Sequence, residues 1–432
     1  MGDSAMTNNK PSIKKVVKAL LKLQDIGESG TLLGIGPMSS NLLQASFELG
    51  RDLDFPLMFI ASRNQVDLDE LGGGYVNNWN QQQFAQDICQ IATSTGFNGI
   101  YYLCRDHGGP WQRDAERNMH LSEDEAMALA RQSYLADMIA GFDLLMIDPT
   151  KDPYQVGKEI PLDIVLHRTV DLIEWCETER RKRGLPEIGY EVGTEETNGG
   201  LTSPEKYQTF IDQLAIELDR RQLPMPTFIV GQTGTLIRQA KQVGHFDFKA
   251  ASELSKLARQ YGVGLKEHNG DYLDDIVLME HIPSHVLASN VAPMYGTEET
   301  KAYISLCKFE EKLIKDQLIA PTEKSNLIHT LLIKALETGR WRKWTIGNDS
   351  LLTNEEVLAN KQLSKQVLAT SGHYVFNDDE VRREITRLYS NLSKVGINGK
   401  RFVINRIKRS LQQYVEAYCL EGITTRINNV IN

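Results

Sequence analysis

Two histidines and several carboxylates follow short apolar runs of the sequence, and these residue types suit acid–base and metal chemistry. Asp106 and His107 stand together after one run, and His268 follows another. Imidazole nitrogens and carboxylate oxygens bind catalytic zinc, usually as three protein ligands with one open position. The combination indicates a metal-dependent active site, although a lone histidine in such a place is more often a hydrogen-bonded loop residue.

Lys266 stands two residues before His268 and therefore shares the same side of a strand. An inward-facing lysine of a barrel can form a Schiff base with a ketone. It can equally anchor a phosphate or form an ion pair with Glu191. The sequence leaves these three interpretations open.

Polar side chains also follow the other apolar runs. We expect them to contact a small-molecule substrate if the runs are strands that meet at one edge. The candidate substrate-binding residues are Asn64, Gln65, Arg105, Asp148, Gln232, Asp271 and Asn290.

Eight short apolar runs are the candidate strands that position these residues: 31–36, 57–61, 100–104, 143–147, 187–191, 227–230, 263–267 and 285–290. Their near-continuous apolarity is typical of parallel strands buried on both faces. Amphipathic helical patterns separate them, and Ser203 followed by Pro204 is a typical helix start. The alternation predicts an α/β fold, a (β/α)₈ TIM barrel, rather than a doubly wound sheet. Active sites of such barrels lie at the C-terminal ends of the strands.

The chain of 432 residues is longer than one barrel requires. We expect an N-terminal helical extension over 1–29 and the barrel over 30–320. The remaining 321–432 is helical in pattern. This last region is expected to pack on the barrel or to form a contact of a homo-oligomer.

Composition excludes several classes of protein. The net charge of -9 argues against a nucleic-acid scaffold, which would carry a basic face. The 5 cysteines are scattered, which argues against a disulfide framework. No apolar run approaches the ~20 residues of a membrane span, and the start has no signal-peptide pattern. We therefore expect a cytoplasmic protein. No phosphate-binding glycine motif supports binding of ATP or NAD.

Several short blocks of the sequence, 62–75, 106–110, 193–195 with 199–200, and His268 with 271–272, occur in the order found in one known family. They resemble the class II tagatose-1,6-bisphosphate aldolase subunit that is often called non-catalytic and is sometimes labelled a tagatose-6-phosphate kinase. The resemblance extends from about Gly34 into the C-terminal helices.

The resemblance implies a barrel related to zinc-dependent ketose-bisphosphate aldolases. Asp106 would then be the catalytic acid/base, and His107 and His268 would be metal ligands. Glu195 would supply the carboxylate ligand, with Glu191 as the alternative. The implied cofactor is a divalent metal, with zinc as the first choice.

Glu195 and Lys266 are further catalytic candidates. The implied activity is retro-aldol chemistry on a ketose or ketose phosphate, either aldol cleavage or epimerisation at carbon 4. One alternative is an accessory subunit that stabilises a separate class II aldolase chain, and a second is a Schiff-base aldolase that uses Lys266. Arg105 and Lys266 stand where the family commonly has glycine and an acidic residue. These extra cations would change how an anionic substrate is held.

Overall fold

Eight parallel strands close into a barrel, which confirms the predicted fold class. The structure is a computed structural model that describes residues 10–156, 158, 160–194, 200–345 and 347–432. Around the barrel the strands follow the order of the chain, with a small antiparallel hairpin, β7 (Ile237–Arg238) and β8 (Lys241–Gln242), between the sixth and seventh. The barrel strands are β1 (Leu32–Ile35), β2 (Leu57–Ser62), β3 (Tyr101–Gly108), β4 (Leu144–Ile147), β5 (Gly189–Val192), β6 (Phe228–Val230), β9 (Gly264–Glu267) and β10 (Ala288–Val291).

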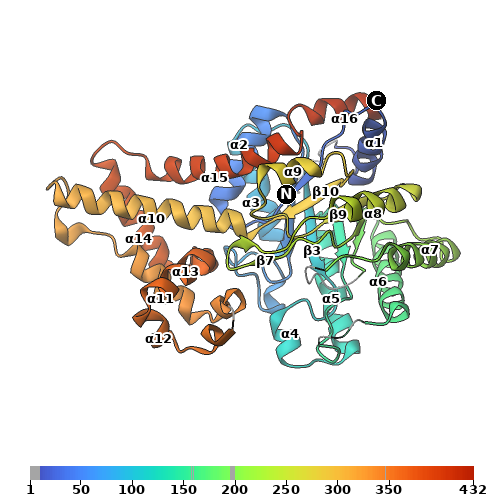
Figure 1. Cartoon of the computed structure of the whole chain (residues 1–432), viewed down its shortest axis with the longest axis horizontal. Helices are drawn as coiled ribbons and strands as arrows, with labels where there is room; N and C mark the ends of the chain where they lie inside the picture. Colours follow the sequence, from blue (N-terminus) through green and yellow to red (C-terminus); the bar gives the residue numbers. More distant parts are fainter. Residues whose placement is uncertain (1–9, 157, 159, 195–199, 346) are drawn as a thin grey trace.

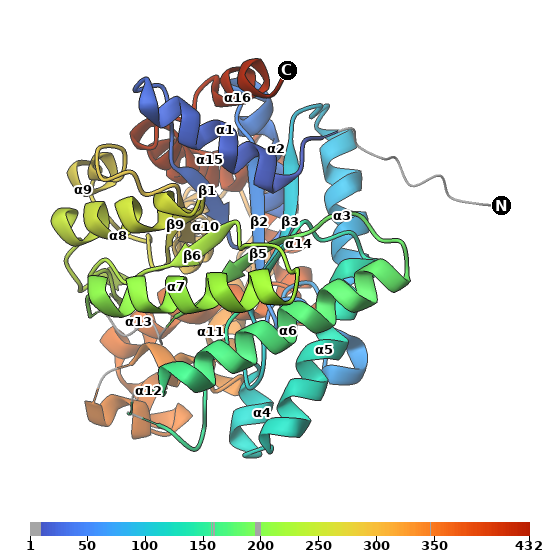
Figure 2. The ribbon, with the colours of Figure 1, turned by 90° about the vertical axis from the view of Figure 1, so that its right-hand side faces the viewer.

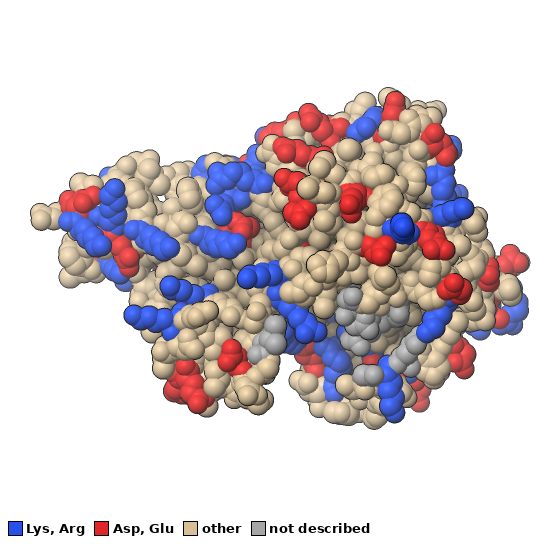
Figure 3. Space-filling model, viewed as in Figure 1, with Lys and Arg blue, Asp and Glu red and all other residues tan. Residues whose placement is uncertain are grey.

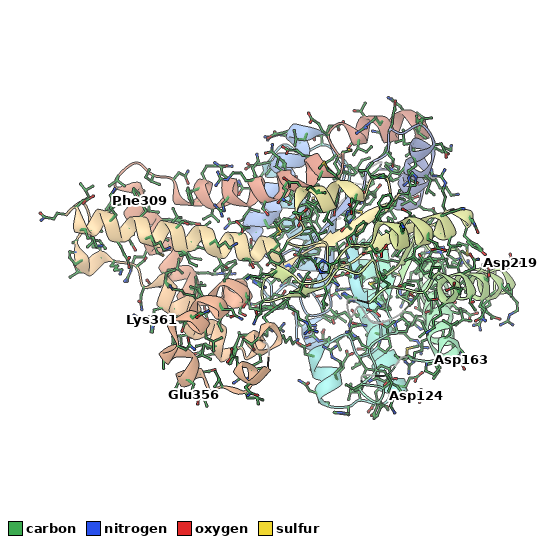
Figure 4. All side chains as sticks on the ribbon, in the orientation of Figure 1. Asp124, Asp163, Asp219, Phe309, Glu356 and Lys361 are labelled. Carbon is green, nitrogen blue, oxygen red and sulfur yellow. The ribbon has the colours of Figure 1, made fainter. Side chains whose placement is uncertain are left out.

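Helices surround the barrel on its outer side (Figure 2). They pack apolar faces against the strands, while acidic residues such as Asp124, Asp163 and Asp219 are exposed on the outer surface (Figure 4). Ser203 caps α7 by accepting a hydrogen bond from the backbone of Lys206, as the sequence predicts. The helices of this layer are α2 (Ser40–Leu53), α3 (Gln81–Ser94), α4 (Asp114–Asn118), α5 (Glu123–Ile139), α6 (Leu162–Lys182), α7 (Pro204–Arg220), α8 (Phe248–Gln260) and α9 (Asp275–Glu280).

Helix α1 (Ile13–Asp25) packs at the N-terminal end of the barrel. The Ile13 side chain lies against Gly189, at the start of β5, where a Cβ would approach it to 2.7 Å. Just before the helix, the carbonyl of Pro11 accepts a hydrogen bond of 2.7 Å from the hydroxyl of Tyr102. The opposite end of the barrel is therefore the one that bears the candidate site.

After β10, helices project from the barrel as an arm made of α10 to α14 (Figure 1). Helix α15 runs back along α10 to pack on α2, and α16 ends against α1. A small apolar cluster of Leu336, Trp341, Val357, Leu363 and Val367 holds part of the arm together. The domain boundaries stay a prediction. These helices are α10 (Pro293–Lys315), α11 (Leu327–Glu337), α12 (Asn354–Ala359), α13 (Lys361–Ser371), α14 (Asp379–Ser393), α15 (Gly399–Ala417) and α16 (Ile423–Ile431).

Short 3₁₀ turns lie in the connections of both the barrel and the arm. They are η1 (Asp69–Leu71), η2 (Pro321–Glu323), η3 (Arg340–Trp344), η4 (Gly347–Leu351) and η5 (Gly372–Val375). None of the helices that the structure describes is long and apolar enough to span a membrane.

Candidate active site

Strand β3 places Asp106 and His107 at the C-terminal end of the barrel. It ends at Gly108, four residues beyond the predicted end, and Asp106 still pairs with Ser62 on β2. The register against β4 then shifts between Arg105 and Gly108, and His107 adopts the left-handed conformation with φ 46°. Such a bulge re-aims a side chain, and here it lets two consecutive residues serve one site.

The glycines after His107 allow β3 to lie this close to its neighbour. A Cβ on Gly108 would be 2.6 Å from the carbonyl oxygen of Met146 and from the ring of Tyr134. Gly109 has φ 122°, and a Cβ there would be 2.6 Å from the carbonyl oxygen of Asp148. The sequence Asp-His-Gly-Gly is therefore needed for backbone packing as well as for chemistry.

His107 is held by a carboxylate from the next strand. Its Nδ1 lies 2.7 Å from Oδ2 of Asp148, whose other oxygen accepts a hydrogen bond of 2.5 Å from the hydroxyl of Thr150. Burial opposes ionisation of Asp148, but the hydrogen bonds from His107 and Thr150 lower its pKa to about 2. Burial alone would lower the pKa of His107, but the negative charges of Asp106 and Asp148 raise it to about 9. Asp148 therefore orients His107, whereas the sequence suggested contact with substrate.

His268 is held in the same way by Glu191 on β5. Its Nε2 lies 2.8 Å from Oε1 of Glu191, and Oε2 of the same carboxylate accepts a hydrogen bond of 2.5 Å from Nζ of Lys266. Burial would raise the pKa of Glu191, but the charge of Lys266 and the hydrogen bond to His268 hold it below its usual range. The ion pair that the sequence suggested between Lys266 and Glu191 is thus present in the barrel interior.

Asp106 lies between the two histidines. Its oxygens are 4.0 Å from Nε2 of His107 and 3.9 Å from Nε2 of His268, and the two imidazole rings are perpendicular with centroids 5.0 Å apart. Among the described residues, Asp106, His107 and His268 form a group whose possible ligand atoms all lie within 4.8 Å of one another. These three residues are among the metal-site and catalytic candidates that the sequence suggested, and the structure places them side by side.

Asn290 on β10 completes the centre of the site. Its Nδ2 donates a hydrogen bond of 3.0 Å to Oδ1 of Asp106 from across the barrel. Its Oδ1 is buried and has no hydrogen-bond partner within the described ranges. A buried amide oxygen without a partner is unusual, and this one lies against Gly34 of β1, where a Cβ would approach it to 2.1 Å.

Arg105 lies outside this group, and the structure corrects the expectation that it contacts substrate. Its guanidinium points out of the barrel and pairs with both carboxylate oxygens of Asp137 on α5. It also donates to the carbonyls of Ala61 and Val66, and the side chain is fully buried. Strand alternation explains this position, because an inward Asp106 requires an outward Arg105.

The other candidates lie around the rim. Asp271 accepts hydrogen bonds from the backbone of Ala292 and Met294 at the start of α10, and burial raises its pKa to about 7. Gln65 accepts a hydrogen bond from the backbone of Ser62, and Asn64 donates to the carbonyl of Gln112. These contacts shape loops.

Gln232 and Glu195 are the two remaining candidates. Gln232 is buried just beyond the end of β6. Glu195 lies outside the described residues, so its role as a carboxylate ligand stays a prediction.

The sequence analysis missed the contribution of the arm to this end of the barrel. The turn η3 brings Arg340 over the ring of Tyr75, in the loop after β2, at 4.6 Å from the ring centroid. Lys343 of the same turn forms an ion pair of 2.5 Å with Asp114, the first residue of α4, which follows β3. The signal available was the cluster of basic and aromatic residues at 340–344.

The fold and the site together define a (β/α)₈ barrel protein with two carboxylate-backed histidines and an aspartate at the C-terminal ends of its strands. The chain belongs to the "D-tagatose-1,6-bisphosphate aldolase subunit GatZ/KbaZ-like" family, whose model matches residues 17–432. This confirms the family resemblance noted in the sequence. A search among curated proteins finds no match.

Two solved structures are similar to this chain to different degrees. A crystal structure described as "a probable tagatose 6 phosphate kinase" from Sinorhizobium meliloti 1021 is similar with a TM-score of 0.73 and 19% identity, covering 90% of this chain and 100% of that one. A fructose-bisphosphate aldolase from Campylobacter jejuni is more distant, with a TM-score of 0.48 and 12% identity over 94% of this chain and 95% of that one. At 19% identity, the likeness to the Sinorhizobium meliloti protein concerns the fold alone.

Proposed function

We propose that this protein is a metal-dependent enzyme that acts on a ketose or ketose phosphate by retro-aldol chemistry. The observation that carries the proposal is the grouping of Asp106, His107 and His268 at the end of the barrel. Membership of an aldolase-subunit family supports the substrate class. Zinc is the metal that we propose for the site.

The residues present fit such a metal. Each histidine uses one ring nitrogen for a buried carboxylate, Asp148 or Glu191, as metal-binding histidines commonly do. The other nitrogen of each ring has no hydrogen-bond partner in the described part of the chain. A divalent metal bound there supplies Lewis-acid stabilisation of the negative charge that develops on the carbonyl oxygen of the substrate.

Asp106 is the proposed acid/base. As the carbon–carbon bond breaks, its carboxylate takes the proton from the hydroxyl of the leaving carbon, which becomes an aldehyde. The hydrogen bond from Asn290 fixes one oxygen of Asp106 and leaves the other toward His107.

Release of both fragments makes the enzyme an aldolase. Rotation of the aldehyde in place, followed by bond formation, makes it an epimerase at carbon 4. Asp106 serves both outcomes, since it returns the proton to the new alkoxide in the second case. Product analysis after incubation with a ketose phosphate distinguishes the two.

Metal analysis of the purified chain tests the proposal. We expect about one zinc or manganese per chain, as in single-metal catalytic sites. His107→Ala should lose both metal and turnover, whereas His329→Ala, an exposed histidine of α11, should keep both. Unchanged turnover in His107→Ala would refute the proposal.

A non-catalytic role is the second candidate function, because the family is described as a subunit of an aldolase. In that case the chain would stabilise a separate class II aldolase chain. Size-exclusion chromatography with light scattering, with and without a co-expressed aldolase, separates the two roles. An active homo-oligomer that forms without a second chain would exclude the accessory role.

A Schiff base at Lys266 is the third candidate. Its amine is buried against Glu191, within 5.7 Å of the Phe228 ring centroid, which favours an ion-pair role instead. Borohydride treatment in the presence of a ketose should therefore leave the Lys266 peptide unmodified. A mass increase on that peptide would revive this mechanism.

A further inference from the structure

The arm brings basic residues to the end of the barrel that bears the candidate site. Turn η3 (Arg340–Trp344) lies between α11 and α12 and contacts the loops after β2 and β3. On the face seen in Figure 3, Lys and Arg side chains gather where the arm meets the barrel. Turn η3 itself is distant in sequence from every barrel strand.

A short chain of contacts joins this turn to His107. Lys343 pairs with Asp114, whose backbone N–H donates a hydrogen bond of 3.3 Å to Oδ1 of Asn64. The Asn64 side chain donates a hydrogen bond of 3.2 Å to the carbonyl of Gln112. The Gln112 side chain in turn donates a hydrogen bond of 2.8 Å to the carbonyl of Asp148. Asp148 is the residue that holds His107. Turn η3 therefore lies at the rim of the same site.

Positive charge is in excess around Asp114. Three cations surround this one carboxylate: Arg117 at 2.5 Å, Lys343 at 2.5 Å and Arg340 at 4.0 Å. Opposite charges within a few ångströms neutralise one another, but one carboxylate cannot neutralise three cations. The cluster thus has a net positive charge that an anionic group can complete.

Arg340 is the guanidinium of this cluster that has donors to offer. Its guanidinium carbon lies 4.6 Å from the ring centroid of Tyr75 and 5.3 Å from that of Tyr374, so two aromatic rings hold it in place. Within the described ranges its side chain has no hydrogen-bond acceptor. By contrast, Arg105 and Arg113, at the same end of the barrel, donate to several carbonyls and carboxylates.

We propose that Arg340 binds the phosphoryl group of the substrate at the rim of the barrel, with Lys343 adding positive charge. A guanidinium presents a planar fork of donors that matches phosphate oxygens, and stacking on Tyr75 and Tyr374 orients that fork in advance. The arm is then part of the active site, because it supplies the residue that selects phosphorylated sugars. This inference rests on the proposed function and names the substrate class within it.

Binding of inorganic phosphate to the full chain tests the inference without any need for turnover. A ³¹P NMR titration of the wild type should show saturable binding. Arg340→Met should weaken that binding by at least about tenfold, as expected for loss of a charge-assisted bidentate contact. Arg340→Lys keeps the charge but loses the fork, so it should give a smaller loss.

Arg342→Met is the matched control. Arg342 is in the same turn, but its guanidinium stacks on Trp341 and donates to the carbonyl of Leu352. We expect this variant to bind phosphate within about twofold of the wild type, because it leaves the Arg340 fork in place. Circular dichroism confirms that the variants are folded.

Two results would overturn the inference. One is phosphate affinity in Arg340→Met and Arg340→Lys equal to that of the wild type, which would leave Arg340 only the role of docking the arm. The other is absence of phosphate binding by the wild type. Failure of the proposed function has a different signature, namely a chain that binds phosphate through Arg340 but has neither metal nor turnover.

Discussion

Metal binding at this site should depend strongly on pH because of the surroundings of His107. The charges of Asp106 and Asp148 raise its pKa to about 9, so the imidazole of the metal-free protein carries the extra proton at neutral pH. A histidine ligand must be neutral, and binding therefore has to release that proton. Because the pKa is raised, the apparent affinity should increase as the pH rises toward 9.

The structure sets the size of this effect. Each pH unit below the pKa weakens binding by a factor of about 10, so the full shift amounts to a factor of about 100 between pH 9 and pH 7. The side chain of His107 is 34% exposed, however. Solvent screening weakens the influence of the two carboxylates, and we expect a decrease of roughly 10- to 100-fold.

Isothermal titration with zinc in buffers of different ionisation enthalpy measures the released protons directly. We expect nearly one proton per zinc at neutral pH and fewer near pH 9. The control is Asp148→Asn, which keeps the size of the side chain but removes its charge. In this variant fewer protons should be released per zinc bound, and the zinc affinity should depend less on pH. Zinc affinity that stays constant between about pH 6.5 and 8.5, without proton release, would refute this reasoning.

Three further single variants and one double variant probe the site. Asp106→Asn should lower turnover by about 10²–10⁴-fold while metal stays bound through the histidines. Steady-state kinetics together with metal analysis measures both quantities. Turnover close to that of the wild type would contradict an acid/base role. Lys266→Met leaves the buried carboxylate of Glu191 without its cation and should lower the free energy of unfolding by about 3–5 kcal/mol in urea denaturation. Adding Glu191→Gln should recover part of that loss, whereas strictly additive effects would argue against the ion pair. Gly34→Ala would place a Cβ 2.1 Å from Oδ1 of Asn290 and displace that amide; turnover should fall with metal content unchanged, and wild-type turnover would show that the amide position does not matter.

Grouping of the catalytic candidates was predictable because parallel strands of a barrel bring their C-terminal ends to one place. This holds for Asp106 and His107, which lie in β3, and for His268, which directly follows β9. The prediction failed for Arg105, because the apolar run ends at residue 104 and the residues after it are therefore assigned to a loop. The strand in fact continues to Gly108, and its alternation fixes which residues face inward. An extension by a few polar residues was therefore enough to assign one side chain to the wrong face.

The arm was less predictable for a different reason. Amphipathic periodicity shows that a helix such as α15 has an apolar face, but it does not say which surface covers that face. Here α15 packs on α2, and turn η3 reaches the loops after β2 and β3. Contacts of this kind join residues about 230 positions apart, as in the pair of Lys343 with Asp114. No local pattern in the sequence encodes such a partner.

The position of Lys266 explains why a charge lies inside the barrel at all. It precedes His268 by two residues, which places it about 6.6 Å deeper along the strand than the histidine. A carboxylate behind His268 orients the imidazole, but a buried carboxylate without a cation is strongly destabilising. Lys266 supplies that cation, since its amine is 2.5 Å from Glu191 and both side chains are fully buried. A substrate carbonyl held at the level of His107 and His268 would lie above this pair, so Lys266 acts on the site through Glu191.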